Sequence, residues 1–183
     1  MFRKILLIAL VAGCCGAASA AEPKEKGFYI GAAGGTSLYD DDGAFSFAGF
    51  DDDDNSRQLH AGYKIFPYVA VEVRHVDFGT YSLGFLGSSL DFTATSVHAV
   101  GMFPFGASGW EIFGQIGLGD LNVDIQGAGS IDDGGVVSGG FGVRYHATKG
   151  LSIGVQADVY VWEDSAIYDM GVGSTQLSIN YIF

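Results

Sequence analysis

Apolar and polar residues alternate one by one in several short segments of this 183-residue chain, and this pattern limits the fold more than any other feature. Between positions 69 and 74, Val69, Val71 and Val73 share one parity, while Glu72 and Arg74 share the other. Successive side chains of a β-strand point to opposite faces. The alternation therefore predicts strands with one apolar and one polar face, and it continues to the last residues of the chain.

We predict eight strand segments, and no segment after residue 20 is long and apolar enough to cross a membrane as a helix, which needs roughly 18 apolar residues. Even so, 48% of all residues are hydrophobic. Only helices and closed β-barrels satisfy every backbone hydrogen-bonding group inside a bilayer. We therefore predict an all-β fold, a closed eight-stranded antiparallel up-and-down barrel. Its predicted strands are 27–38, 57–65, 69–78, 90–103, 110–119, 136–146, 151–162 and 170–183.

The connections between these segments alternate in length. The long ones are 39–56, 79–89, 120–135 and 163–169, and the short ones are 66–68, 104–109 and 147–150. Short turns at one end and long loops at the other are typical of outer-membrane barrels, whose loops face outside the cell.

One predicted strand, 90–103, breaks the alternation. Asp91 and Thr95 share a parity with Val97 and Phe103, so the polar side changes partway along the segment. A β-bulge near Ser96 is one explanation, because a bulge adds a residue and shifts the facing of everything beyond it.

The first twenty residues indicate export. Arg3 and Lys4 precede the apolar run 5–11, and the small residues at 18–20 form a cleavage site, so we predict a signal peptide over 1–20. Residues 21–26 would then be a short lead and 27–183 the barrel domain. An alternative is a lipoprotein signal over 11–14, with Cys14 acylated. On the first cleavage the mature chain loses both cysteines, Cys14 and Cys15, and has no thiol chemistry.

Without Arg3 and Lys4, 7 basic residues remain against 21 acidic ones, a formal charge of −14. A basic face for nucleic acid or for an anionic bilayer is therefore not expected.

Charged residues collect on one side of the predicted strands. A soluble ligand-carrying barrel would line its cavity with the apolar side, but paired charges and glycines suit the narrow interior of a membrane barrel, with the apolar side toward lipid. We expect this network either to plug and orient the barrel or to gate a narrow path through it. Its members are Lys64, Glu72, Arg74, Glu111, Arg144 and Asp158.

Four stretches, GFYIGAAGG, AGYKIFPYVAVEV, GVRYHATKGLSIGVQADVYV and LSINYIF, give the chain a family resemblance. It resembles the small eight-stranded outer-membrane β-barrels of Gram-negative bacteria, including the OmpA-type transmembrane domain, over residues 27–183. The resemblance implies outer-membrane localisation, delivery by periplasmic chaperones, and a last strand that pairs with 27–38. It also implies that the barrel-assembly machinery reads the terminal signal Leu177, Ile179, Tyr181 and Phe183.

For function, we expect a monomeric, non-enzymatic barrel with no cofactor. Its role would be membrane integrity together with loop contacts to host molecules, other cells or lipopolysaccharide. A small gated channel is the alternative, and a lipid A-modifying enzyme is a third class. An enzyme is disfavoured because its catalytic groups must converge, whereas His60, His75, His98 and His146 are scattered along the chain.

Seven of the 21 acidic residues lie within 39–56. Asp51, Asp53 and Asn55 have the spacing that opens an EF-hand, but Ser56 replaces the turn glycine and Gly62 stands where the last glutamate belongs. A solvated acidic loop is the main expectation, and loose binding of divalent cations is the alternative.

Overall fold

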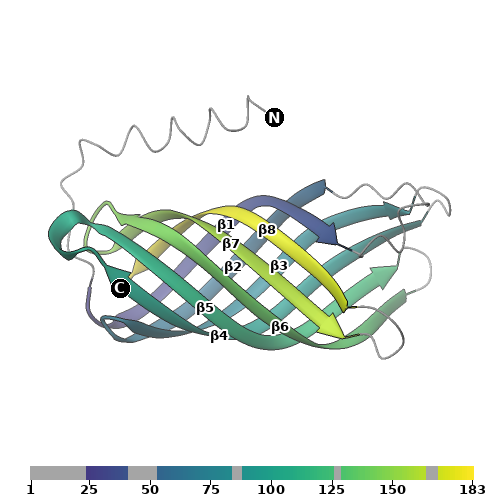
Figure 1. Cartoon of the computed structure of the whole chain (residues 1–183), viewed down its shortest axis with the longest axis horizontal. Coiled ribbons are helices and arrows are strands. Elements are labelled where there is room, and N and C mark those ends of the chain that lie inside the picture. Colours follow the sequence, from purple (N-terminus) through teal and green to yellow (C-terminus); the bar gives the residue numbers. More distant parts are fainter. Residues whose placement is uncertain (1–23, 41–52, 84–87, 126–128, 164–168) are drawn as a thin grey trace, which may run out of the picture.

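The computed structural model describes residues 24–40, 53–83, 88–125, 129–163 and 169–183. Eight antiparallel strands form a closed barrel in which each strand pairs with its neighbours in sequence, as predicted (Figure 1). A short 3-10 helix, η3 (Gly106–Ser108), lies between β4 and β5. The strands are β1 (Gly27–Asp40), β2 (Asp53–Phe66), β3 (Val69–Leu83), β4 (Ser88–Pro104), β5 (Trp110–Ile125), β6 (Gly129–His146), β7 (Leu151–Glu163) and β8 (Asp169–Ile182).

The first and last strands close the barrel. Tyr29 of β1 is opposite Ile182 of β8, and the ladder continues to Asp40 opposite Gly171. Beyond β8, the backbone amide of Phe183 donates to the carbonyl of Phe28 at 2.9 Å. The predicted pairing of the terminal strand with 27–38 is confirmed. Among the described residues, no helix has the length and apolar character needed to span a membrane.

The three short turns lie at one end of the barrel, together with the end of β8, at the left of Figure 1. We call this the turn end, and the opposite end the loop end. The strands run further toward the loop end than predicted: β5 continues to Ile125 and β6 begins at Gly129, six and seven residues beyond the expected limits. The ladder of backbone hydrogen bonds continues here, but the polarity of the two faces is reversed in β5: Leu121 is buried inside, while Asp120 and Asn122 are exposed on the outside.

The predicted bulge near Ser96 is wrong. The register of β4 is continuous through Ser96, which is opposite Arg74 on β3 and Gly119 on β5. The irregularity lies in β3, between Asp77 and Thr80, where Gly79 adopts a φ of 88°. The polarity of β4 changes for another reason: its inward residues near the loop end, Phe92 and Ala94, are apolar and buried. The facing does not switch between Asp91 and Phe103.

The two faces of the wall have the predicted orientation. Val71, Val143 and Val155 are 38–43% exposed on the outside, whereas Glu72 and Arg144 are 4% and 9% exposed inside. Large apolar side chains therefore cover the outer surface, and many aromatic ones stand near the turn end. Those include Phe28, Tyr63, Phe66, Tyr68, Phe103, Phe105, Trp110, Tyr181 and Phe183. Aromatic residues commonly mark the interface between the hydrocarbon core and water.

Candidate functional site in the barrel interior

The interior is filled in three layers along the barrel axis. Near the loop end lies an outer apolar layer, in the middle a central polar network, and near the turn end a charged cluster around Glu111 packed beside apolar residues. The outer apolar layer consists of Val76, Phe78, Phe92, Ala94, Leu121, Val136, Tyr160 and Val172.

The outer apolar layer spans the full width of the barrel. Phe78 belongs to β3 and Tyr160 to β7, and these strands are four positions apart in a ring of eight, on opposite walls. Their rings pack edge to face with centroids 5.0 Å apart. Both side chains are fully buried. Side chains from opposite walls thus meet in the lumen, as expected for a barrel whose interior is only wide enough for its own side chains.

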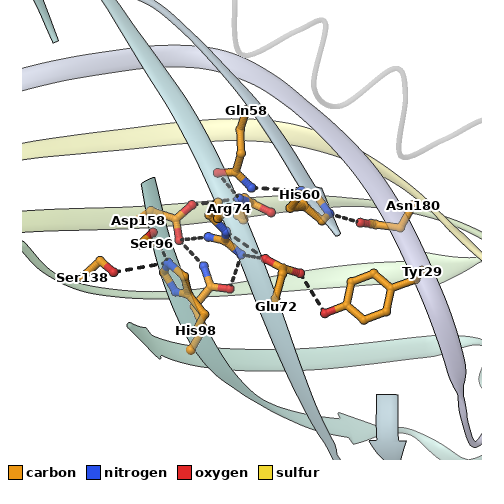
Figure 2. Close-up of polar contacts among 12 residues, drawn as sticks. Tyr29, Gln58, His60, Glu72, Arg74, Ser96, His98, Ser138, Asp158 and Asn180 are labelled. Carbon is orange, nitrogen blue, oxygen red and sulfur yellow. Dashed lines mark hydrogen bonds and ion pairs between the residues drawn. The ribbon is translucent and has the colours of Figure 1, made fainter. Parts of the chain in front are cut away.

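Arg74 is the centre of the polar network, and its side chain is 2% exposed (Figure 2). It donates to Glu72 Oε1 from Nε at 2.8 Å and also from Nη2. Across the lumen, Nη1 reaches Asp158 Oδ1 at 3.3 Å, and Nη2 donates to Gln115 Oε1 at 2.6 Å. Tyr29 donates its hydroxyl to Glu72 Oε2 at 2.8 Å. One buried guanidinium therefore links three walls of the barrel, with the multiple hydrogen bonds that a buried charge requires.

Neutral polar side chains extend this network. Gln156 Nε2 donates to Asp158 Oδ2 at 2.8 Å and lies 3.3 Å from Gln58 Oε1. Gln58 Nε2 is 3.1 Å from His60 Nδ1, and His60 Nε2 is 2.5 Å from Asn180 Oδ1. The His60 tautomer with its proton on Nε2 satisfies both contacts, since Gln58 then donates and Asn180 accepts.

Glu111, which is fully buried, is the centre of the charged cluster at the turn end. Its Oε1 accepts from Arg144 Nε at 2.5 Å, and its Oε2 lies 3.6 Å from Lys64 Nζ and 3.7 Å from His146 Nε2. The Arg144 guanidinium also stands 4.5 Å from the ring centre of Phe113. A cavity of about 30 Å³ beside this cluster is large enough for water but not for a metabolite.

The six predicted lumen residues thus fall into two groups. Glu72, Arg74 and Asp158 belong to the central network, whereas Lys64, Glu111 and Arg144 form the turn-end cluster. Among the described residues no hydrogen bond or ion pair joins the two groups, and the apolar side chains of Ala70, Val100, Met102 and Phe113 pack with Tyr29 at the turn-end side of the central network. With ordinary ionisation, the central group has one negative charge in excess and the turn-end group one positive charge.

The six predicted network residues do not include its neutral members. Gln58, Gln115, Gln156 and Gln176 are all buried, and each contributes a hydrogen bond. In β2, β5 and β7 the glutamines have the parity of the inward charges, and this signal could have identified them; Gln176 shares its parity with the buried Ser174 and Asn180 of β8, which has no inward charge among its described residues. The outer apolar layer was missed because the polar side of the strands was expected to line the interior along its whole length.

The histidines do not converge on one site. His60, His98 and His146 are buried inside, while His75 faces outward and its Nδ1 lies 2.9 Å from Thr95 Oγ1. His98 Nε2 lies 2.8 Å from Ser96 Oγ, but its Nδ1 has no hydrogen-bond partner in the described part of the chain. A serine nucleophile would require a carboxylate at that nitrogen.

The described residues of the EF-hand-like pattern do not form an EF-hand loop. Positions 53–62 lie in β2, with Asp53 opposite Leu38 and Asn55 opposite Thr36, so they cannot form an EF-hand loop. Positions 41–52, which hold much of the acidic segment, lie outside the described residues. Within the described ranges no group of three or more His, Cys, Asp or Glu side chains is arranged to hold a metal ion.

The predicted terminal signal lies on the outer surface. Leu177, Ile179, Tyr181 and Phe183 are all exposed and share the lipid-facing side. The Tyr181 and Phe183 rings pack edge to face with centroids 5.1 Å apart. Residues 1–23, which include the predicted signal peptide, lie outside the described residues.

Comparison with known proteins gives the family. The model of the family described as "Outer membrane protein beta-barrel domain" matches residues 7–183. The chain belongs to this family. Members are outer-membrane barrels, so the family places this protein in the outer membrane and implies a Gram-negative source. A sequence search of curated proteins gives no match.

Solved structures of small outer-membrane barrels are similar in fold. Neisserial surface protein A has a TM-score of 0.64 and 15% identity, with 87% of this chain and 99% of that chain covered. The attachment invasion locus protein Ail of Yersinia pestis has 0.60 and 18%, with 87% and 100% covered. The N-terminal barrel domain of Pseudomonas aeruginosa OprF has 0.58 and 14%, with 86% and 100% covered. At these identities the similarity concerns the fold alone.

Proposed function

We propose that this protein is a closed, non-conducting and non-enzymatic barrel that anchors its loop-end segments at the cell surface, where they make structural or adhesive contacts. Export through the predicted signal 1–20 would deliver it to the outer membrane. The observation that carries the proposal is the filled interior: contacts between opposite walls occur both at Phe78–Tyr160 and at Arg74–Asp158.

The charge distribution supports a closed interior. A permeating anion would meet the excess negative charge of the central network, and a cation would meet the excess positive charge of the Glu111 cluster. Either ion would also have to cross the outer apolar layer, where it would lose its hydration without a compensating partner. Moving Arg74 alone would leave that layer in place.

Planar bilayer recording tests this closed state against the gated channel. We expect no steady openings from the purified protein, and the same silence from Glu72→Gln. Steady openings whose conductance changes in Glu72→Gln would instead establish the channel. The double variant Phe78→Ala, Tyr160→Ala tests the outer apolar layer separately, because it removes the ring contact in this layer while the Arg74 contacts remain.

Ail was crystallised with the heparin analogue sucrose octasulfate. We expect the surface of this protein to avoid such a sulfated ligand. This chain has a formal charge of −12, and seven of its acids lie within 39–56. A sulfated polyanion would be repelled by such a surface. We expect the folded protein to pass through a heparin column unretained at low salt, and retention that salt abolishes would contradict this view of the loops.

The proposed lack of an enzymatic role is supported by the scattered histidines and by the buried Ser96–His98 pair, in which His98 Nδ1 has no hydrogen-bond partner among the described residues. Expression of the protein should therefore leave the mass spectrum of lipid A unchanged. A new lipid A species that disappears in Ser96→Ala would overturn this part of the proposal.

A further inference from the structure

A shallow groove of about 630 Å³ crosses the outer face of the barrel over β8, β1 and β2 to β3. Its floor is low because Ala32 and Ala61 carry small side chains next to the backbone of Gly31. Large exposed side chains form its walls, among them Ile30, Leu59, Ile179 and Tyr181. The volume lies within the range of ligand sites, about 300 to 1,000 Å³. Because the groove is apolar and faces lipid, an acyl chain fits its chemistry.

At β3 the groove ends at polar groups. His75 lines it and is exposed to the outside, although its position lies directly opposite the apolar Leu59. Thr95 is within hydrogen-bond distance of His75 Nδ1, at 2.9 Å. If the Thr95 hydroxyl donates, Nε2 carries the proton and is the donor left for a ligand.

Arg57 stands next to this end of the groove. It is opposite Asp77, one position diagonal from His75 on the same outward face, and such diagonal neighbours lie about 7–8 Å apart. Arg57 lies nine positions before Phe66, at the turn end of β2. At a rise of about 3.3 Å per residue and a tilt of about 40°, Arg57 lies about 23 Å from the turn end along the barrel axis. This is close to the height of a lipid-facing apolar band, about 25 Å, so Arg57 lies near its outer edge.

Arg57 is also exceptional among the basic residues of the chain. Those from position 24 onward are inside the barrel or at the turn end, except for Arg57: they are Lys64, Arg74 and Arg144 inside, and Lys24, Lys26 and Lys149 at the turn end. Arg57 is therefore the one basic residue from position 24 onward that faces outward in the outer half of the barrel, and it borders the groove at its histidine end.

We propose that this groove binds lipid A in the outer leaflet, with one acyl chain over Ala32 and Ala61 and a headgroup phosphate at Arg57 and His75. Arg57 is suited to this contact because its guanidinium matches phosphate geometry with two parallel hydrogen bonds. Within the described residues, Arg57 has no ion pair.

The negative charge of Asp77 opposes the bound phosphate, so removing Asp77 should change lipid A binding in the opposite direction from removing Arg57. Its side chain is exposed beside Arg57, and its Oδ1 accepts from the Gly79 amide at 2.9 Å. Removing this charge with Asp77→Asn should strengthen phosphate binding at Arg57. A site in which a divalent cation bridges Asp77 to the lipid would respond in the opposite direction.

The test is native mass spectrometry of the folded protein, released from detergent with hexa-acylated lipid A in the presence of EDTA. Arg57→Gln should weaken lipid A binding about tenfold, and Ala61→Leu should weaken it by filling the groove. Asp77→Asn should strengthen it. The matched controls are Lys149→Gln, a basic residue at the turn end, and Ala99→Leu, an outward alanine of β4; both should bind as the unchanged protein does.

Gel mobility of unboiled samples establishes that each variant is folded. Phosphatidylglycerol and dephosphorylated lipid A serve as competing ligands, and both should bind more weakly than lipid A. Equal binding of phosphatidylglycerol, equal losses in the two controls, or binding that requires magnesium would each overturn the proposal. Undiminished binding by Arg57→Gln would overturn it as well.

Discussion

Replacing Arg74 with methionine removes the cation that two buried carboxylates share. Glu72 and Asp158 are 4% and 2% exposed, so neither can be solvated by water once the guanidinium is gone. Removing one partner of a buried ion pair typically costs about 3–5 kcal/mol. The loss should not double for two carboxylates, because Tyr29 still donates to Glu72 and Gln156 to Asp158. We expect Arg74→Met to lower the free energy of unfolding by about 4 kcal/mol.

Urea unfolding in phospholipid vesicles, followed by gel mobility and tryptophan fluorescence, measures this change. Lys149→Met is the matched control, since Lys149 is exposed in a turn and such surface substitutions usually change stability by less than about 0.5 kcal/mol. Adding Glu72→Met to Arg74→Met should restore part of the stability, because it removes one of the unpaired carboxylates. A loss below about 1 kcal/mol for Arg74→Met, with an unchanged dependence on urea, would refute the reasoning.

Three further predictions concern assembly, glycine packing and the turn-end cluster. Deleting Phe183 should lower the amount of folded barrel in the outer membrane of cells while leaving refolding into detergent intact; an unchanged cellular yield would argue against an assembly signal. Gly31→Ala should destabilise the barrel by about 1–3 kcal/mol in the same urea titration, because the new Cβ would lie 2.2 Å from His60 Nε2, whereas Gly114→Ala, whose nearest atom is 3.9 Å away, should be tolerated. Glu111→Gln should cost about 3 kcal/mol by leaving its two buried cationic neighbours without an anion, and a loss equal to that of a surface substitution would contradict the central place of Glu111 in its cluster.

Parity explains why so much of the wall could be predicted from the sequence. Val71 and Glu72 lie next to each other in the chain, and the strand period sends them to opposite faces wherever β3 begins or ends. The same reasoning correctly placed all six predicted charges inside. It failed for Phe92 and Phe78, because parity defines the face of a side chain but not whether that face is lined by polar or apolar neighbours at a given height.

The six predicted charges form two groups instead of one network because they lie at two different heights along the barrel axis. Glu111 and Arg144 are direct register partners, and so are Glu72 and His98, but nothing in a single strand indicates which residues of other strands share its level. That level depends on the tilt and stagger of all eight strands together. Contacts across the lumen, such as Arg74 to Asp158, depend on it most strongly.

Spin labelling of β3 tests the orientation of the wall most directly. Single cysteines at Val71, Glu72, Val73 and Arg74, each carrying a nitroxide, would be measured in vesicles for collisions with oxygen, which dissolves in lipid, and with a water-soluble nickel complex. The account predicts high oxygen accessibility at Val71 and Val73 and low accessibility to both reagents at Glu72 and Arg74. High oxygen accessibility at Glu72 and Arg74, with Val71 and Val73 protected, would contradict it.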